Sequence, residues 1–120
     1  MTATQPNQHA WRRDRELLEF ETQDNDERLP LASFMNDVIL PASNSRGAQV
    51  LRSGATTACA GRLAAWSITV SLPVQPDAHA IVETIVAVSG NHAYLATYAR
   101  PSTSKPRADA ERAIRTLCLR

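Results

Sequence analysis

The alternation of apolar and polar positions is clearest between residues 80 and 100, where two strand-like runs flank one tight turn. The run over 81–88 is apolar on both faces apart from two polar residues in its middle, which is typical of a strand inside a sheet. A Gly-Asn pair follows at 90–91, and both residue types tolerate the positive φ that a two-residue hairpin loop requires. The pattern therefore predicts a β-hairpin whose second arm runs over 94–99.

The stretch before this hairpin has the cleanest period of two in the chain. Between residues 63 and 72 one face carries Ala64, Trp66, Ile68, Val70 and Leu72, and the other carries Ala65, Ser67, Thr69 and Ser71. This pattern predicts a strand with one buried and one polar face, as in an antiparallel sheet. A further strand is predicted over 48–57, followed by a turn over 58–61.

Two segments show the helical period instead. The first has an apolar stripe with i, i+3, i+4, i+7, i+8 spacing, formed by Leu31, Phe34, Met35, Val38 and Ile39. Pro41 is expected to close this helix, because proline has no backbone N–H to donate. The second segment, 107–119, has a stripe formed by Ala110, Ala113, Ile114, Leu117 and Cys118. Both segments are predicted to be amphipathic helices.

The N-terminal part of the chain is harder to interpret. A helix over 11–22 would have a poor apolar stripe, whereas a strand would place Leu18, Phe20 and Thr22 on one side. We favour the strand, as the second arm of a hairpin that turns through residues 13–15. Residues 1–10 are polar and lack the apolar core of a signal peptide, so they are predicted to be a disordered leader.

Together these elements predict an α+β fold, with a central antiparallel β-sheet covered by two amphipathic helices in an α/β/α sandwich. At 120 residues the chain is long enough for one domain, predicted over 11–120. A formal net charge of +1 favours neither nucleic acid nor a membrane surface as a partner. No apolar run approaches the length of a membrane-spanning helix.

The two cysteines, Cys59 and Cys118, allow three interpretations. A disulfide between them would close a long loop and hold the last helix, which is the element most liable to fray. Alternatively they are buried thiols that pack as small apolar groups, or one of them is a reactive thiol. We favour the disulfide, because the sequence has no Cys-x-x-Cys motif and no His or acidic residue close to Cys59.

Other candidate chemistry is sparse. Glu83 interrupts an apolar strand, so it is either an unusual carboxyl with a raised pKa or one paired with an arginine such as Arg62 or Arg100. The three histidines have no metal-ligand spacing. The large aromatic residues of the predicted strands, Trp66, Tyr94 and Tyr98, either pack in the core or line a ligand groove. No catalytic residue, cofactor or metal site is predicted.

Charged residues are unevenly distributed along the chain. Residues 14–27 carry seven acidic groups and one basic group, whereas residues 100–120 carry six basic groups and two acidic ones. These segments are either two faces for different partners, or the complementary halves of a dimer, or neighbours in the fold that attract one another weakly. We favour neighbours in the fold.

The elements of the C-terminal half resemble the PsbP-like superfamily, which includes small exported bacterial proteins of the DcrB type. The resemblance rests on the strand over 63–72, the hairpin over 81–98 with its Gly-Asn turn and Tyr-x-x-x-Tyr second arm, and the closing helix over 107–119. It implies a non-enzymatic accessory or binding protein that is exported to the periplasm or the cell exterior. It assigns a role to no single residue.

The sequence therefore predicts a non-enzymatic accessory domain that binds a protein partner, with no nucleic-acid partner, and is locked by a Cys59–Cys118 disulfide. The alternative is a domain that binds a small ligand or acts as an enzyme, using a groove near Trp66, Tyr94 and Tyr98 with Glu83 beside it. A homodimer through an edge strand is a third interpretation.

Overall fold

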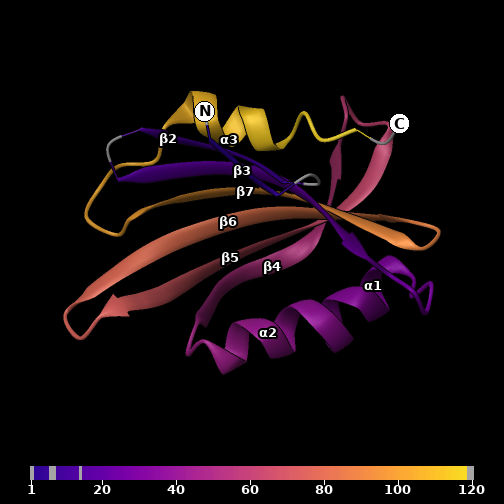
Figure 1. Ribbon diagram of the computed structural model, residues 1–120, viewed down its shortest axis with the longest axis horizontal. Helices are drawn as coiled ribbons and strands as arrows, with labels where there is room; N and C mark the ends of the chain where they lie inside the picture. The colour runs from indigo at the N-terminus through magenta and orange to yellow at the C-terminus, as the bar shows by residue number, and fades with distance from the viewer. Residues whose placement is uncertain (1, 6–7, 14, 119–120) are drawn as a thin grey trace.

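The computed structural model describes residues 2–5, 8–13 and 15–118, with side chains from residue 10 onward. Seven strands form one antiparallel sheet in the order β1-β2-β3-β7-β6-β5-β4 (Figure 1). The strands are β1 (Thr2–Gln5), β2 (Gln8–Arg13), β3 (Glu16–Asp24), β4 (Gln49–Ala58), β5 (Leu63–Gln75), β6 (Ala78–Ser89) and β7 (His92–Pro101). The helical elements are α1 (Leu31–Phe34), the π-helical turn η1 (Met35–Ile39), α2 (Leu40–Ser45) and α3 (Ala108–Ile114).

The central hairpin of β6 and β7 is confirmed. The two strands pair from Ala80 with Pro101 to Ser89 with His92, and Gly90 turns the chain with φ of 58°. Each strand of the hairpin also has an outer neighbour, β5 for β6 and β3 for β7, so the hairpin lies inside the sheet. This position explains why its first arm is apolar on both faces.

Cross-strand pairing assigns each side chain to one of two faces. Trp66 pairs with Val86, which pairs with Leu95, so these three residues share the face toward α1 and η1, called here the α1 face. Ile85 pairs with Ala96 on the opposite side, called the α3 face. Each face carries its own apolar core, because successive residues of a strand point to opposite sides of the sheet.

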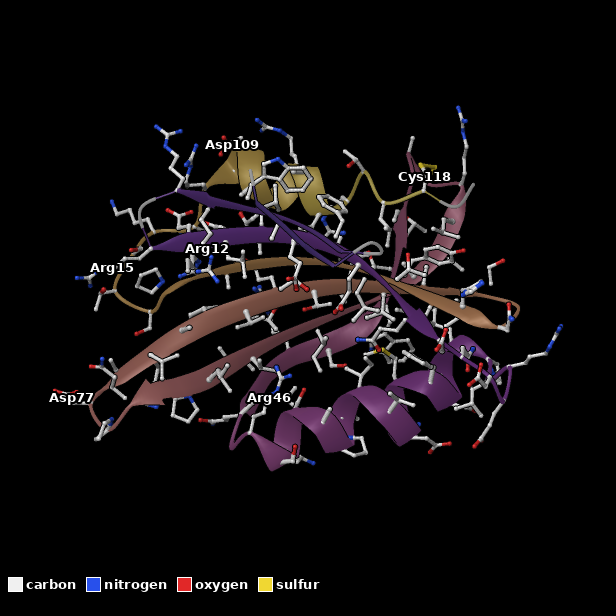
Figure 2. The ribbon with its side chains drawn as sticks, viewed as in Figure 1. Arg12, Arg15, Arg46, Asp77, Asp109 and Cys118 are labelled. Atoms are coloured by element: carbon white, nitrogen blue, oxygen red, sulfur yellow. A yellow bond between two sulfur atoms is a disulfide. The ribbon has the colours of Figure 1, made fainter. Side chains whose placement is uncertain are left out.

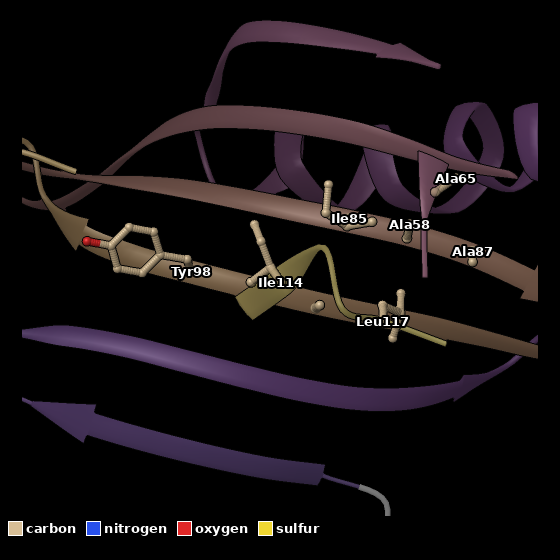
Figure 3. Packing of buried hydrophobic residues seen from close by; sticks show 8 residues of the cluster. Ala58, Ala65, Ile85, Ala87, Tyr98, Ile114 and Leu117 are labelled. Atoms are coloured by element: carbon tan, nitrogen blue, oxygen red, sulfur yellow. The ribbon is translucent and has the colours of Figure 1, made fainter. Parts of the chain in front are cut away.

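On the α3 face, residues from the last part of the chain pack over the middle of the sheet (Figure 3). Ile114 and Leu117 are buried against β6 and β7. The buried residues of this cluster are Ala58, Ala65, Ile85, Ala87, Ala96, Tyr98, Ile114 and Leu117. Alanines at these sheet positions let the short helix approach the strands closely.

On the α1 face, Phe34 and Met35 are the anchors, each 1% exposed. They pack with the buried sheet residues Ile68, Val70, Val86, Ala93 and Leu95. The sequence predicts that the second face of β5, which carries Ala65 and Thr69, is polar. In the structure this is the α3 face, and both residues are buried there. β5 therefore contributes to both cores.

The first helical segment does not end at Pro41, and that expectation is wrong. The segment continues through Pro41 to Ser45, with the π-helical turn immediately before it. Pro41 has no backbone N–H to donate to the carbonyl of Asp37, four residues earlier in η1. A π-helical turn pairs residues five apart instead of four, so the helical segment does not need that hydrogen bond. Each residue advances less around the axis in a π turn, so Ile39 joins the stripe of Phe34 and Met35 while Val38 is 37% exposed.

The expected α/β/α sandwich is wrong. Strands account for most of the described residues and helices for far fewer, so two helical layers do not cover the sheet. One helical segment spans residues 31–45, and α3 has only seven residues, about two turns. The predicted helix over 107–119 ends at Ile114, where short i→i+3 hydrogen bonds from Arg115 to Arg112 and from Thr116 to Ala113 replace helical ones.

The strand predicted within 11–22 is confirmed as part of β3. It pairs with β2 from Gln8 with Glu21 to Arg13 with Glu16, which is the predicted hairpin. Part of the stretch predicted to be a disordered leader forms β1 and the start of β2. No helix among the described residues is long and apolar enough to span a membrane.

Candidate functional site

The structure separates Trp66, Tyr94 and Tyr98, the three aromatic residues considered from the sequence either as core residues or as the lining of a ligand groove. Tyr94 and Tyr98 lie on the α3 face, and Trp66 lies on the α1 face. Tyr98 is 1% exposed, whereas Trp66 is half-buried and its indole Nε1 donates to Ser53 Oγ at 2.8 Å. One groove cannot be lined by all three side chains, because the sheet lies between them.

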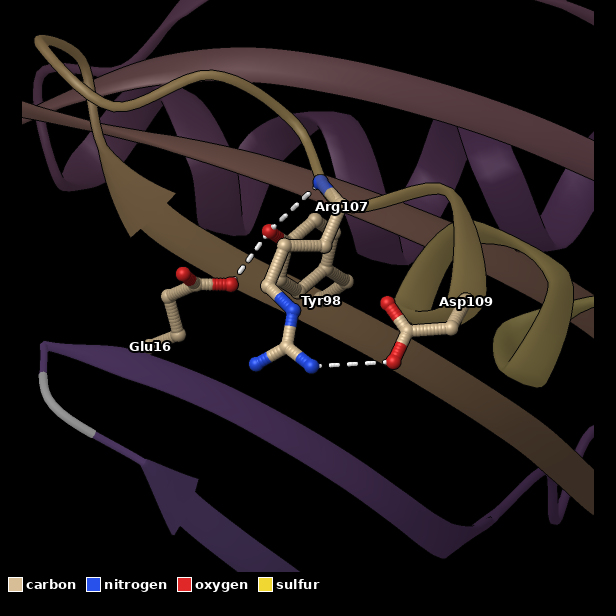
Figure 4. Close-up of polar contacts among 4 residues, drawn as sticks. All are labelled: Glu16, Tyr98, Arg107 and Asp109. Atoms are coloured by element: carbon tan, nitrogen blue, oxygen red, sulfur yellow. Dashed lines mark hydrogen bonds and ion pairs between the residues drawn. The ribbon is translucent and has the colours of Figure 1, made fainter.

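The hydroxyl of Tyr98 holds the start of α3 to the sheet (Figure 4). It donates to a carboxylate oxygen of Glu16 on β3 and accepts the backbone N–H of Arg107 at 3.2 Å. The Arg107 guanidinium in turn lies 2.9 Å from the Asp109 carboxylate. Burial, followed by the hydrogen bond to Glu16, raises the pKa of Tyr98, so the phenol stays protonated. The role of these contacts is structural.

Glu83 also lies on the α3 face, beside Tyr98 in the β6–β7 register. Burial raises the pKa of Glu83, and the neighbouring Glu111 carboxyl raises it further, both as hydrogen-bond partner and as a like charge. Arg100 and Arg52 oppose the shift. One Glu83 carboxyl oxygen and the Arg100 Nε are buried without a hydrogen-bond partner among the described residues. The arginine pairing considered from the sequence is therefore an electrostatic attraction to Arg100 without a close ion pair.

This arrangement predicts a pH effect on stability. A carboxyl whose pKa is raised in the folded state lowers the free energy of unfolding as pH rises from about 4.5 through the raised value. Glutamine cannot ionise, so we expect Glu83→Gln to be more stable than the wild type at pH 7 and to differ little from it at pH 4. Urea unfolding midpoints at both pH values measure the difference.

The exposed Glu27 supplies the matched control, since Glu27→Gln removes the same charge from a loop. That variant should follow the wild type at both pH values. A loss of stability in Glu83→Gln at pH 7 that exceeds the change in Glu27→Gln would contradict the expectation.

The predicted disulfide is confirmed. Cys59 and Cys118 are bonded, with their Cα atoms 4.9 Å apart and a sequence separation of 59 residues. Cys59 lies in the turn between β4 and β5, where Cys59, Ala60 and Gly61 all have positive φ. Its backbone N–H also donates to the Arg115 carbonyl at 3.0 Å. The bond therefore joins the β4–β5 turn to the segment after α3 (Figure 2), and both thiols are consumed.

The acidic and basic segments of the chain are neighbours in the fold. β3, which carries much of the acidic segment, pairs along its length with β7, which leads into the basic segment. The contact of Glu16 with Tyr98, and through it with Arg107, lies at this boundary. The arrangement agrees with the interpretation that the two segments attract one another weakly.

Strand β4 is the first candidate surface that the sequence does not identify. It is the last strand in the sheet order, so only one of its sides is paired. All of its residues except Ala58 are at least partly exposed, with Val50 at 38% and Leu51 at 48%. Among the described residues, no backbone hydrogen bond outside the sheet involves 49–58. The one sequence signal is the lack of large apolar residues after Leu51, which is unusual for an interior strand.

A second candidate site is a cleft of 190 Å³ between α2 and the α1 face. Its apolar floor comes from β5, β6 and β7, and β3 supplies a polar rim. The floor includes Ile68, Val70, Leu72, Val82 and Leu95, the rim has Glu19, Glu21 and Gln23, and the helix side has Ile39, Ala42, Ser43 and Arg46. Figure 2 shows Arg46 at the end of α2, beside the sheet. The period of two in β3 is enough to place Glu19 and Glu21 on one face of the strand. The sequence does not show that α2 lies beside that face, because this contact depends on the tertiary fold.

Glu21 is the polar group of this cleft with a perturbed ionisation. Burial raises its pKa, and the nearby Glu19 charge raises it further, while a hydrogen bond from Gln23 Nε2 at 3.3 Å and the charge of Arg46 lower it. The cleft thus combines an apolar floor with an acidic rim, as is typical of a ligand-binding pocket. Comparison with protein-family models and with curated proteins finds no match to this chain.

Proposed function

We propose that this protein is a non-enzymatic accessory domain that binds a protein partner, and that an extended segment of the partner adds to the sheet along β4. The observation that carries the proposal is the open, ten-residue edge of β4. An unpaired edge presents backbone N–H and C=O groups in a row, and an added strand satisfies them.

The edge has few of the features by which proteins prevent strand addition. Charged side chains, proline and bulges usually protect such edges. In β4 the irregular pairing lies between Val50 and Arg52, and Arg52 is the strand's one charged residue. From Ser53 to Thr57 the strand pairs regularly with β5 and carries only small, uncharged side chains. A Cβ placed on Gly54 would meet no atom within 4 Å, so the surface there is open.

The charges at this edge favour an acidic partner segment. Arg52 lies on the strand, and the Arg115 guanidinium donates to Thr56 Oγ1 at 3.2 Å. A second copy of the chain, paired through the same edge, would bring the arginines of both copies close together and is disfavoured by their repulsion. An extended segment with acidic residues would be attracted instead.

The resemblance to the PsbP-like superfamily and the disulfide support the further proposal that the domain is exported. Disulfides persist in oxidising compartments such as the periplasm and the cell exterior. The alternative of a small-ligand or enzymatic groove at Trp66, Tyr94 and Tyr98 is not favoured, because these residues lie on opposite faces of the sheet.

Two proline variants test the edge. Successive backbone N–H groups of β4 point alternately toward β5 and toward the open side of the strand. One of the two variants Gly54→Pro and Ala55→Pro therefore removes an N–H that points outward, and the other removes a hydrogen bond to β5. The variant that removes the outward N–H, called here the outward variant, should keep most of the wild-type thermal stability. Comparing the melting temperatures of the two variants therefore shows which of them is the outward variant. The probe is a short acetylated peptide of alternating valine and glutamate, followed by amide chemical shifts and amide hydrogen exchange.

The peptide should shift β4 amides of the wild type and slow their exchange, and the outward proline variant should lose this response. A peptide of alternating valine and lysine should bind more weakly than the valine–glutamate peptide. Added salt should lower the affinity of the valine–glutamate peptide for β4. Strand addition is wrong if neither peptide perturbs β4, or if the outward variant binds as the wild type does. A concentration-dependent dimer that the same variant abolishes would assign the edge to a second copy.

A further inference from the structure

We propose that the cleft between α2 and the α1 face binds a small organic cation with an apolar body, of the alkylammonium class. This inference concerns a different surface from β4, and it stands whether or not the edge strand binds a partner. It rests on the shape of the cleft, the order of polar and apolar side chains along its floor, and the sign of the charge at its rim.

Polarity changes in one direction across the sheet. Glu19 on β3 pairs with Thr97 on β7, Thr97 pairs with Thr84 on β6, and Thr84 pairs with Ile68 on β5. All four residues line the cleft, and the two threonine hydroxyls lie 3.2 Å apart. The row thus runs from a carboxylate through two hydroxyls to an aliphatic side chain. A ligand with a polar head and an apolar tail matches this order, with its head toward β3.

The charge at the polar end selects the head group. Two carboxylates, Glu19 and Glu21, and one guanidinium, Arg46, line the cleft. The charge of Glu19 raises the pKa of Glu21 more than the charge of Arg46 lowers it, so negative charge outweighs positive charge at this end of the cleft. A cationic head would be attracted there and an anionic head repelled. An ammonium group brings three donors. The carboxylates and the threonine hydroxyls are acceptors that lie on the same side of the cleft.

The ionisation of Glu21 agrees with a cationic ligand. Burial and the charge of Glu19 make its ionised form unfavourable and raise the pKa of this carboxyl. A cation beside it would relieve both effects, since an opposite charge stabilises the ionised form.

The volume of the cleft limits the size of the ligand. The cleft has a volume of 190 Å³. It is below the range of about 300–1,000 Å³ that is typical of drug-sized ligands. A linear C6 amine is therefore a suitable probe, with an expected dissociation constant of about millimolar for so few heavy atoms.

The experiment compares three probes with the same tail, n-hexylammonium, n-hexanol and n-hexanoate, by amide chemical-shift titration of the full chain. We expect hexylammonium to bind most tightly, hexanol more weakly and hexanoate least. The shifts should concentrate on residues of the cleft, including Glu21, Val82 and Thr97. In Glu21→Gln the affinity for hexylammonium should fall about tenfold, whereas that for hexanol should change little.

Asp77→Asn is the matched control, because it removes the same charge from the exposed β5–β6 turn (Figure 2). It should leave all three affinities unchanged. Three results would overturn the proposal: no saturable shifts in the cleft, equal binding of hexanol and hexylammonium, or an unchanged hexylammonium affinity in Glu21→Gln. Peptide binding at β4 is measured separately, so failure of one proposal does not decide the other.

Discussion

The double variant Cys59→Ala, Cys118→Ala is expected to lose about 4 kcal/mol of its free energy of unfolding. The disulfide closes a loop with a sequence separation of 59 residues, and the chain-entropy model gives this value for the conformational freedom that the unfolded chain regains. Urea unfolding of oxidised wild type and variant at the same pH measures the difference. Such a loss is a large fraction of the stability of a small domain.

Reduction of the wild type provides the control. A reductant should lower the wild-type midpoint to that of the variant and leave the variant unchanged, which separates the loss of the bond from the replacement of the two cysteine side chains. Should the variant be too unstable to fold, partial reduction of the wild type gives the same comparison within one sample. Equal stability of oxidised and reduced wild type would contradict the expectation.

Phe34→Ala is expected to cost about 3–5 kcal/mol, the usual range when a fully buried phenylalanine is truncated. Phe34 is 1% exposed and packs on the apolar core of the α1 face, so its removal leaves a cavity that the rigid sheet cannot close. The variant should also loosen the helical segment over 31–45, which that core holds to the sheet. Urea unfolding and amide exchange across this segment are the measurements.

Val38→Ala is the matched control within the same helical segment. Val38 is 37% exposed, so truncation should cost well under about 1 kcal/mol. A regular α-helix would bury both residues in one stripe, and the two variants would then both be costly. Similar losses in the two variants would therefore contradict the π-helical turn at Met35–Ile39 as well as the packing of Phe34.

Local signals predicted the parts of the fold that depend on local chemistry. The Gly90–Asn91 turn and its apolar flanks were sufficient to identify the central hairpin. The period of two identified β5 and the strand β3. Of the interpretations of Cys59 and Cys118, the favoured one proved correct, because a disulfide requires only that the last segment return to the β4–β5 turn.

What the sequence could not predict depends on register and strand order. Each strand shows which residues share a face, but it does not show which faces of two strands coincide. Only the pairing of Trp66 with Val86, and of Val86 with Leu95, shows that Tyr94 and Tyr98 lie on the other side. The same limit hid the open edge of β4, since no local pattern states that a strand is last in the sheet.

Helix content was misjudged for a different reason. An amphipathic stripe predicts which side of a helix is buried, but not how far the helix extends. The C-terminal stripe includes Leu117 and Cys118, yet α3 ends at Ile114. Leu117 is buried and Cys118 is bonded to Cys59, so both positions are set by tertiary contacts of a non-helical segment. Their spacing only resembles that of a helix.

The position of the Cys59–Cys118 bond also determines how the domain would bear mechanical tension. A pull that enters from the chain beyond residue 118 passes through the sulfur atoms to Cys59 and bypasses β5, β6, β7 and α3. The bypassed loop would otherwise add roughly 200 Å of extended chain at about 3.3–3.6 Å per residue. The load instead reaches the end of β4, where it tends to separate β4 from β5 one residue pair at a time. The open edge strand is thus also the mechanically exposed one, and reduction of a single covalent bond would transfer the load to the strands in the middle of the sheet.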